Sequence, residues 1–414
     1  MTTAAVPACR ACGAALRDTF VDLGLSPVSN AFIPADRART GEMFYPLHAQ
    51  VCRACWLVQL EDVERAENLF PDDYVYFSSY STSWLEHARR YVTAVSARFG
   101  LGPHSQVVEV ASNDGYLLQY FVQAGVPCLG VEPTANTARA AREKGVPTRE
   151  AFFGVATARQ LLAEGCQADL LLGNNVLAHV PDINDFVGGM AVLLKPEGVI
   201  TLEFPHLLRL MEGNQFDTIY HEHFSYLSLI ALLPVFDRAG LRVFDVETLP
   251  THGGSLRLYA CHRPASHADT GAAGALVARE EAAGLRRVET YAAFDAKVRE
   301  TKRALVEFLI TQTRAGRRIA AYGAAAKGNT LLNYCGIRAD FIDYVVDRNP
   351  VKQGMLLPGT RIPVLAPERI AETRPDYLLI LPWNIKDEII GQMAFIREWG
   401  GKFVVPIPRP EVIA

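Results

Sequence analysis

The chain reads Val107-Val108-Glu109-Val110-Ala111-Ser112-Asn113-Asp114-Gly115 where an apolar strand runs into a turn of small and polar residues. The first four residues predict a strand buried on both faces. The small residues of the turn let a ligand approach the backbone at the carboxyl end of that strand, where open α/β sheets bind their cofactors. The segment therefore predicts a cofactor-binding α/β domain.

The surrounding segments continue the pattern of a parallel sheet with helices between its strands. Apolar residues at helical spacing predict a helix over 84–99, which Gly100 and the Gly102-Pro103 pair end. A second helix is expected over 116–123, and further buried strands at 128–131, 170–172 and 199–203.

Two later strand-like runs, 241–248 and 256–261, flank a short turn that contains His252-Gly253-Gly254. They predict a hairpin, and hence an antiparallel strand in an otherwise parallel sheet. Such an ending is typical of Rossmann-like methyltransferases. Dehydrogenases carry G-x-G-x-x-G at the first turn to admit a pyrophosphate, and this turn lacks the first two glycines.

Side chains at neighbouring strand ends complete a predicted adenosine-binding rim. Glu132 ends the next strand, about 20 residues on, where a carboxylate accepts from ribose hydroxyls. Asn174-Asn175 follows a third strand, and Phe152 or Phe153 would flank an adenine, although both also fit an ordinary core. The predicted cofactor contacts are Glu109, Ala111, Asn113, Asp114, Gly115, Glu132, Pro133, Phe152, Phe153, Asn174 and Asn175.

Two pairs of cysteines predict a zinc site near the N-terminus. Cys9 and Cys12, and again Cys52 and Cys55, have the C-x-x-C spacing, whereas the other four of the eight cysteines are scattered. Four thiolates complete a tetrahedral shell and leave no open position, so the predicted zinc is structural.

The C-terminal part predicts a second α/β unit. A helical stretch over 271–314, with breaks, leads to strands expected at 318–322, 344–347, 377–381 and 403–406. The predicted fold class is α/β, in three domains: a small zinc-binding domain at 1–72, a Rossmann-like class I methyltransferase domain with an antiparallel final strand at 73–300, and a Rossmann-like α/β domain at 301–414.

The net charge and the distribution of apolar residues indicate which classes of partner are expected. The formal charge of −4 provides no general attraction to nucleic acid or to an anionic membrane. No apolar run of about 18 residues and no leader-like start occurs, so a cytoplasmic protein without membrane contact is expected. A monomer is compatible with the sequence, because an interface between domains of one chain can replace a dimer contact.

Further motifs follow along the chain: Tyr220-His221-Glu222-His223-Phe224-Ser225-Tyr226, His252-Gly253-Gly254-Ser255-Leu256-Arg257 and Gly323-Ala324-Ala325-Ala326-Lys327-Gly328. With the cysteine pairs and segment 109–115 they closely resemble the deoxysugar C3-methyltransferases, over essentially the whole chain. The resemblance implies S-adenosylmethionine as cofactor and a structural zinc. It implies as substrate a nucleotide-linked 4-keto-6-deoxysugar, with dTDP expected as the nucleotide, methylated at carbon 3.

A carbon becomes a nucleophile when a base removes its proton and a neighbouring ketone stores the charge as an enolate. The resemblance assigns this base to His223, with Glu222 and Tyr220 orienting it or contacting the sugar; the alternative is a histidine buried for packing alone. His179 is expected to hydrogen-bond the oxyanion at carbon 4, unless it makes only a local backbone contact.

Predicted substrate contacts lie in several other segments. Tyr74 and Tyr76 would form a lid over the sugar, although their alternation also fits an amphipathic strand. The resemblance implies that at least one of them contacts the substrate, and Tyr76 is counted with the catalytic candidates. Lys327 would meet a phosphate at a helix start, unless the turn serves only close packing of helix on sheet. The full predicted set of substrate contacts is Tyr74, Arg257, Lys327, Asn329, Asp347, Arg348 and Lys352.

Two other functions are compatible with these patterns. One is O- or N-methylation of a nucleotide-sugar, which would leave the methyl group on oxygen or nitrogen. The other is a zinc-stabilised module that binds a nucleotide-sugar without methyl transfer.

Overall fold

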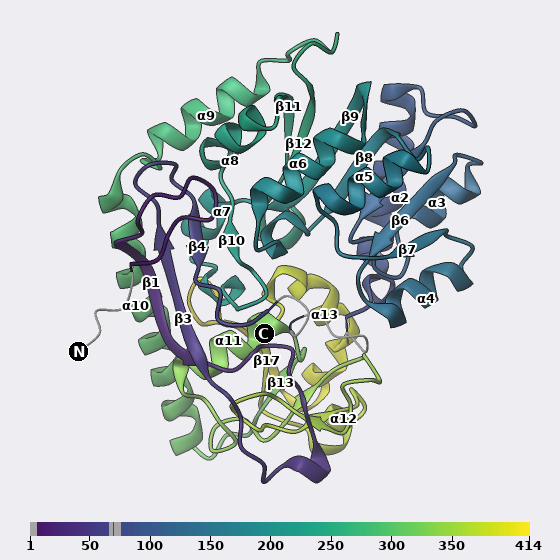
Figure 1. Ribbon diagram of the computed structural model, residues 1–414. Coiled ribbons are helices and arrows are strands. Elements are labelled where there is room, and N and C mark those ends of the chain that lie inside the picture. Colours follow the sequence, from purple (N-terminus) through teal and green to yellow (C-terminus); the bar gives the residue numbers. More distant parts are fainter. Residues whose placement is uncertain (1–5, 66–68, 70–75) are drawn as a thin grey trace.

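A computed structural model describes residues 6–65, 69 and 76–414 (Figure 1). Within these ranges the strands form a seven-stranded, a six-stranded and a four-stranded sheet, with one further two-stranded pair. No helix in the described ranges is long and apolar enough to cross a membrane.

The seven-stranded sheet is built around the strand that precedes the small-residue turn. Its order is β11-β12-β9-β8-β5-β6-β7. β12 runs antiparallel to both of its neighbours and the other pairs are parallel, which confirms the predicted antiparallel strand. The bounds are β5 Val107–Val110, β6 Cys128–Glu132, β7 Thr148–Glu150, β8 Ala168–Asn174, β9 Leu194–Pro205, β11 Leu241–Leu249 and β12 Ser255–His262.

Helices cover both faces of this sheet, and each face has its own apolar core. The Ser81 side chain caps the first turn of α2. The helix ends at Gly100, as the sequence predicts, and this glycine is in the left-handed conformation. The helices are α2 Thr82–Phe99, α3 Leu118–Gln123, α4 Ala135–Glu143, α5 Val155–Ala163, α6 Ile183–Leu193, α7 Leu207–Glu212 and α8 Leu229–Arg238.

The six-stranded sheet forms the C-terminal α/β unit in the order β16-β14-β13-β17-β18-β19, with only β19 antiparallel to its neighbour. The strands are β13 Ile319–Tyr322, β14 Val345–Val346, β16 Val364–Leu365, β17 Tyr377–Ile380, β18 Lys402–Val405 and β19 Glu411–Ile413. The helices are α11 Ala326–Cys335, α12 Arg369–Thr373 and α13 Lys386–Gln392.

The N-terminal unit is joined by strand pairing to both other parts of the chain. Its antiparallel sheet has the order β1-β3-β4-β10, and β10 comes from the segment after β9. A short strand, β2, pairs with β15 of the C-terminal unit. The bounds are β1 Asp18–Ser26, β2 Ile33–Pro34, β3 Tyr45–Val51, β4 Val58–Leu60, β10 Ser225–Tyr226 and β15 Met355–Leu356.

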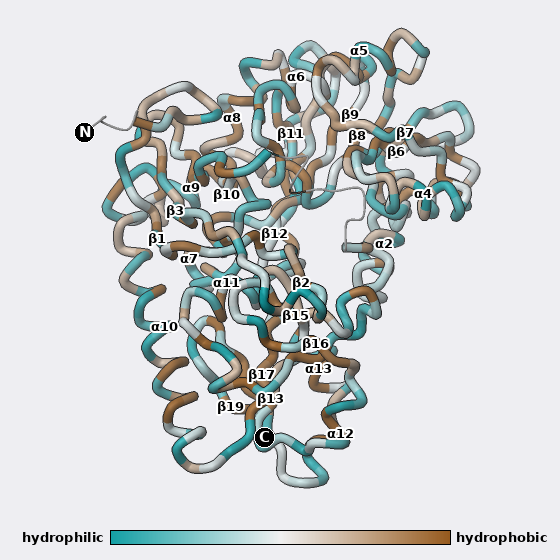
Figure 2. The backbone as a smooth tube through the Cα atoms, turned by 60° about the horizontal axis from the view of Figure 1, so that its bottom comes forward, coloured by the Kyte–Doolittle hydropathy of each residue, from teal (hydrophilic) through white to brown (hydrophobic). Residues whose placement is uncertain are grey.

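Two helices connect the seven-stranded sheet to the C-terminal unit. They are α9 Ala272–Ala282 and α10 Val288–Arg314, and Figure 2 shows α10 running along one side of the molecule. One apolar core contains Phe20 of β1, Phe294 of α10 and Ile319 of β13. The predicted boundary at 300 lies inside the uninterrupted α10, so this helix belongs to both neighbouring units.

Candidate active site

The turn after β5 adopts a conformation that exposes its backbone at the sheet edge. Ala111, Asn113 and Gly115 have φ angles of 54°, 49° and 73°, in the left-handed region that favours glycine. A Cβ at Gly115 would lie 3.0 Å from a methyl of Val146 and 3.2 Å from Cβ of Ala141. Left-handed non-glycine residues cluster at functional sites, so this turn is the first candidate for a ligand-binding edge.

Glu132 lies directly against this turn. Its Oε2 accepts from the Asn113 amide at 2.8 Å, and its Oε1 accepts from the Thr134 amide at 3.0 Å and from the Thr134 hydroxyl. Burial raises the pKa of this carboxyl, which is 4% exposed, and these hydrogen bonds act in the opposite direction. Because a carboxylate offers about four acceptor positions, Glu132 retains room for a further donor such as a ribose hydroxyl.

The segment before α2 is hydrogen-bonded to the same turn. The Ser78 amide donates to Asn113 Oδ1 at 2.9 Å, and Asn113 Nδ2 donates to the Tyr76 carbonyl at 3.2 Å. Lys144 donates from Nζ to the Ser79 hydroxyl at 2.6 Å and to Asp114 Oδ2 at 2.9 Å. Residues 76–79 therefore cover the turn, and Tyr74, the other predicted lid residue, lies outside the described residues.

The remaining predicted cofactor contacts differ in exposure. Glu109 is fully buried in β5, and burial raises its pKa well above the usual range. Phe152 is 43% exposed beyond β7, whereas Phe153 packs edge-on against Phe186 with ring centroids 5.5 Å apart. Phe152 is therefore better placed than Phe153 to flank an adenine, and Pro133 is partly buried after Glu132.

The end of β8 provides an amide at the same edge. Asn174 is its last residue and is 8% exposed. Asn175 has a φ of 54°, its backbone amide donates to the Glu203 carbonyl at 2.7 Å, and its Nδ2 lies 3.0 Å from His252 Nε2. His252 belongs to one of the sequence motifs, but the sequence assigned no role to it. Its contact with Asn175 makes it a functional candidate.

The predicted base and its neighbours form a compact aromatic cluster. The rings of His179 and His223 meet edge-on with centroids 4.6 Å apart, and the Tyr220 ring lies 4.0 Å from that of His223. His223 Nδ1 lies 2.8 Å from the Thr218 carbonyl, and His179 Nδ1 lies 2.8 Å from the Glu222 carbonyl. Since a carbonyl only accepts, both rings carry a proton on Nδ1.

Burial keeps both imidazoles neutral. Burial lowers the pKa of His179 to about 4, and burial lowers the pKa of His223 well below its usual value, with the adjacent His179 ring acting in the same direction. A neutral ring protonated on Nδ1 carries its lone pair on Nε2. His223 is therefore in the form that a general base requires, although its catalytic role stays a prediction.

Glu222, predicted to orient the base or to contact the sugar, binds a residue of the N-terminal unit, and its predicted role stays a prediction. Both carboxylate oxygens accept from Asn30 Nδ2 of the N-terminal unit, at 2.7 and 2.9 Å, and the side chain is 1% exposed. Burial lowers the pKa of Lys352, and the charges of Asp347 and Glu222 act in the opposite direction. Glu222 thus lies where all three parts of the chain meet, and it contributes its backbone carbonyl to His179.

Lys327 faces this cluster from the C-terminal unit. Its Nζ donates to Asn384 Oδ1 at 2.6 Å and lies 4.9 Å from the centre of the Trp383 ring. Burial lowers its pKa, and the charge of Asp217 raises it again. Trp383 Nε1 donates to Asp217 Oδ2 at 2.7 Å, so four residues from three distant segments of the chain form one group. Sequence patterns identified only Lys327 among them.

Four other residues predicted to contact the substrate form hydrogen bonds or ion pairs with other residues of the protein. Asn329 is 1% exposed and donates to the Ser29 carbonyl at 2.7 Å. Asp347 accepts from the Ala324 amide, and Lys352 donates to the Ala324 carbonyl, so both hold the turn after β13. Arg257 is 6% exposed and bonds Glu203 and Glu247, at 2.6 and 3.0 Å, which disfavours its predicted contact with a phosphate.

Comparison with known proteins decides the family. A relative named C-methyltransferase NovU, from Streptomyces niveus, is 39% identical over 410 residues, covering 98% of this chain and 96% of its own. Family models match residues 9–70 ("Putative zinc binding domain"), 84–246 ("Methyltransferase domain") and 250–408 ("C-methyltransferase C-terminal domain").

The chain belongs to the C-methyltransferase family. It is an S-adenosylmethionine-dependent methyltransferase, as the strand-end residues and the resemblance indicate. A ubiquinone biosynthesis O-methyltransferase from Rhodopseudomonas palustris is 22% identical over 33% of this chain and 62% of its own. The solved magnesium protoporphyrin IX methyltransferase from Synechocystis with bound SAH is 17% identical, with a TM-score of 0.35 over 43% of this chain and 84% of its own.

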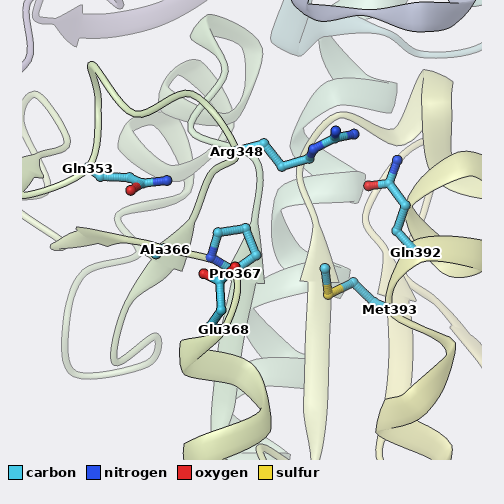
Figure 3. Close-up of a pocket in the computed structure, with 7 residues that line it drawn as sticks. All are labelled: Arg348, Gln353, Ala366, Pro367, Glu368, Gln392 and Met393. Atoms are coloured by element: carbon cyan, nitrogen blue, oxygen red, sulfur yellow. The ribbon is translucent and has the colours of Figure 1, made fainter.

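This C-methyltransferase has a surface pocket of about 590 Å³ in its C-terminal unit (Figure 3). The pocket lies beyond the carboxyl ends of β14 and β16, where α/β sheets bind ligands. Arg348, a predicted substrate contact, extends across it toward Gln392, whose Oε1 accepts from the Tyr322 hydroxyl at 3.1 Å. Its lining is Arg348, Gln353, Ala366, Pro367, Glu368, Gln392 and Met393.

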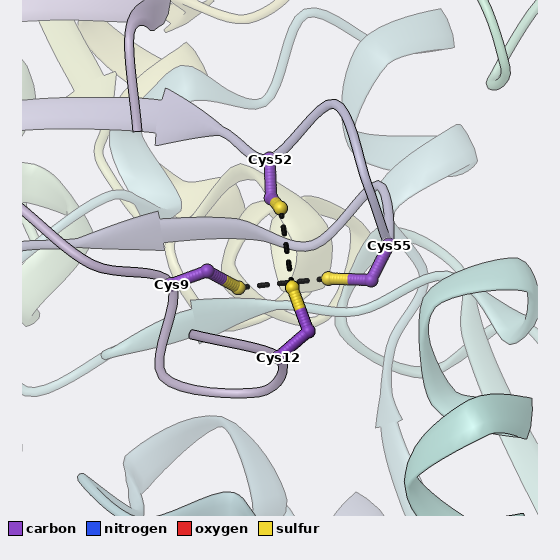
Figure 4. A group of neighbouring side chains, drawn as sticks. All are labelled: Cys9, Cys12, Cys52 and Cys55. Atoms are coloured by element: carbon purple, nitrogen blue, oxygen red, sulfur yellow. Dashed lines mark hydrogen bonds between the residues drawn. The ribbon is translucent and has the colours of Figure 1, made fainter. Parts of the chain in front are cut away.

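The N-terminal unit of this C-methyltransferase brings its four paired cysteines together (Figure 4). Their Sγ atoms all lie within 4.8 Å of one another, with Cys9 to Cys55 and Cys12 to Cys52 each at 3.5 Å. Tetrahedral Zn–S bonds of about 2.3 Å place sulfurs about 3.8 Å apart, so the four thiols fit a zinc ion. Four protein ligands fill the shell, which suits a structural metal.

Proposed function

We propose that the enzyme transfers a methyl group to carbon 3 of a nucleotide-linked 4-keto-6-deoxysugar, with dTDP as the expected nucleotide. The observation that carries the proposal is the neutral His223, whose Nδ1 proton is held by Thr218 and whose Nε2 is therefore the basic atom. A carbon beside a ketone becomes nucleophilic only when a base removes its proton, and a neutral imidazole can act as that base. The membership of the C-methyltransferase family supports carbon as the acceptor.

His223 starts the proposed reaction. Its Nε2 takes the proton from carbon 3, and the electron pair of that bond forms the double bond to carbon 4 while the ketone oxygen becomes an oxyanion. S-adenosylmethionine supplies an electrophilic methyl group on sulfur. Carbon 3 attacks this methyl group, and the electron pair of the broken carbon–sulfur bond stays on sulfur. A positioned base contributes about 10²- to 10⁴-fold to such a step.

Other residues of the cluster have supporting roles in the proposal. His179 lies edge-on to His223 and is assigned to the oxyanion at carbon 4, with its ring oriented by the Glu222 carbonyl. Tyr220, whose ring lies 4.0 Å from that of His223, and Tyr76 are assigned to contact the sugar.

The C-terminal unit holds the nucleotide in this proposal. Lys327 meets a phosphate, because Asp217 favours its charged form against the cost of burial. The pocket beside Arg348 receives the distal part of the nucleotide. Arg257 and Asn329 stabilise the protein instead, since their polar groups already have internal partners.

The test is an assay of the purified enzyme with S-adenosylmethionine and thymidine-, cytidine- and guanosine-linked 4-keto-6-deoxysugars. Product NMR locates the new methyl group. The proposal predicts a methyl on carbon 3. A methyl on oxygen or nitrogen would contradict it, and so would calorimetry showing that the protein binds the nucleotide-sugar but not S-adenosylmethionine.

A further inference from the structure

His252 lies on a loop that the surrounding structure holds in an unusual conformation. The residue has a φ of 53°, although it is not a glycine, at the tip between β11 and β12. Such backbone costs of order 1–3 kcal/mol and persists only where neighbours enforce it. The left-handed backbone of His252 must therefore be held by contacts with its neighbours.

The cause is contact on several sides of the loop. The Thr251 hydroxyl donates to Glu203 Oε1 at 2.9 Å, and Gln215 Nε2 donates to the Gly253 carbonyl at 2.8 Å. A Cβ on Gly253 would lie 2.6 Å from the Trp383 ring, so the loop tip is pressed against the C-terminal unit. The ring of Trp84 meets the His252 ring edge-on, with centroids 5.0 Å apart.

This conformation places the His252 ring between the end of β8, where the cofactor is expected, and the residues assigned to the substrate. Asn175, at the end of β8, lies 3.0 Å from its Nε2. On the other side, the neighbouring Gly253 packs against the Trp383 ring, and Lys327 Nζ lies 4.9 Å from the centre of that ring. His252 therefore lies on a loop that reaches the group around Lys327, and it is partly exposed.

The contact with Asn175 determines which nitrogen carries the proton. Asn175 Nδ2 can only donate, so Nε2 of a neutral His252 accepts and the ring proton is on Nδ1. Among the described residues no side chain or backbone group hydrogen-bonds this Nδ1. The ring therefore presents an N–H donor that the protein itself does not use.

We propose that His252 is a substrate-binding residue whose Nδ1–H donates a hydrogen bond to an oxygen of the sugar. This inference rests on the proposed function and adds a recognition group to the same site. No proton is transferred in this role. Loss of one such hydrogen bond corresponds to about tenfold weaker binding.

Three substitutions separate this role from the contact with Asn175. In His252→Asn the side-chain amide reaches about as far as Nδ1, and asparagine tolerates the left-handed backbone. In His252→Gln the amide reaches the Nε2 position and keeps only the contact with Asn175. His252→Gly relieves the backbone and removes the side chain. The exposed His104 provides a control, His104→Gln.

The experiment measures KM for the nucleotide-sugar, with Kd for S-adenosylmethionine from calorimetry in the absence of sugar. We expect His252→Gln and His252→Gly to raise KM about tenfold and His252→Asn to raise it less, with Kd for the cofactor unchanged. An unchanged KM in the glycine variant, or a shift confined to the cofactor Kd, would overturn the inference alone. A wild-type enzyme that turns over none of the nucleotide-sugars would overturn the proposed function, and the inference with it.

Discussion

His223 Nδ1 lies 2.8 Å from the carbonyl oxygen of Thr218, five residues earlier in the same loop. This hydrogen bond holds the ring in one orientation and places its proton on the nitrogen that faces the backbone. Burial and the neighbouring His179 lower the pKa of the ring well below its usual value. The enzyme therefore carries its proposed base in the neutral form at and below neutral pH.

The first prediction concerns the pH dependence of the reaction. Because the pKa of His223 is lowered, protonation removes the base only at pH values well below about 6.5. We expect kcat/KM for the nucleotide-sugar to stay level from pH 8 through 6.5 and to fall only in more acidic buffer. A pH–rate profile with an acid limb centred at or above 6.5 would contradict this expectation.

A second prediction concerns stability against pH. Burial lowers the pKa of His252 to about 4, whereas in the unfolded chain the pKa is about 6.5. Between these values the unfolded chain binds the extra proton, so acidification favours unfolding by about 1.4 kcal/mol per pH unit. Urea unfolding of wild type and His252→Asn should show this slope as their difference between pH 6.5 and 4. A difference independent of pH would show that His252 keeps an ordinary pKa.

Removal of the metal provides the third prediction. The N-terminal unit supplies β4 to pair with β10 and Asn30 to bind Glu222, so loss of zinc should disturb the active site without a direct contact. We expect Cys52→Ser to lose zinc, lower the unfolding midpoint and abolish methyl transfer. Cys166→Ser, outside the cluster, should keep one zinc per chain by elemental analysis. Full activity in zinc-free protein would refute a structural role.

The fourth prediction addresses the segment that covers the cofactor turn. Lys144 bonds both Ser79 and Asp114, so Lys144→Met should release residues 76–79 from the turn. We expect about tenfold weaker binding of S-adenosylmethionine by calorimetry, because partly buried charged hydrogen bonds contribute about 1.5–3 kcal/mol. Lys195→Met is the control, because it removes an ion pair with Asp169 from a lysine of nearly the same exposure, 34% against 33% for Lys144. Equal cofactor affinity in both variants would exclude this role for Lys144.

The fold was largely predictable because its signals are local. The strand at 107–110 was located to the residue, and the hairpin at 241–261 was recognised from its glycine turn. By contrast β10 has only two residues and pairs with a strand more than 160 positions earlier in the chain, which no local pattern shows. The cysteine cluster was predictable because its spacing follows from the coordination geometry of zinc.

Site residues could be predicted from the sequence only where they belong to a motif that is recognisable by itself. His223 and Glu132 stand in such motifs, but the partners of Lys327 depend on how distant segments meet. Arg257 was predicted to contact the substrate because nothing in the sequence indicates its contacts with Glu203 and Glu247. The left-handed His252 was equally hidden, since the backbone conformation of a non-glycine residue depends on its three-dimensional neighbours.

Deuterium exchange at carbon 3 of the 4-keto-6-deoxysugar tests the central claim most directly. The nucleotide-sugar is incubated in heavy water with folded wild-type enzyme, His223→Ala or the control His104→Ala, and exchange is followed by NMR. We predict rapid exchange with wild type and the control, and a rate at least about 100-fold lower with His223→Ala. Undiminished exchange with the folded His223→Ala protein would contradict the assignment of His223 as the base.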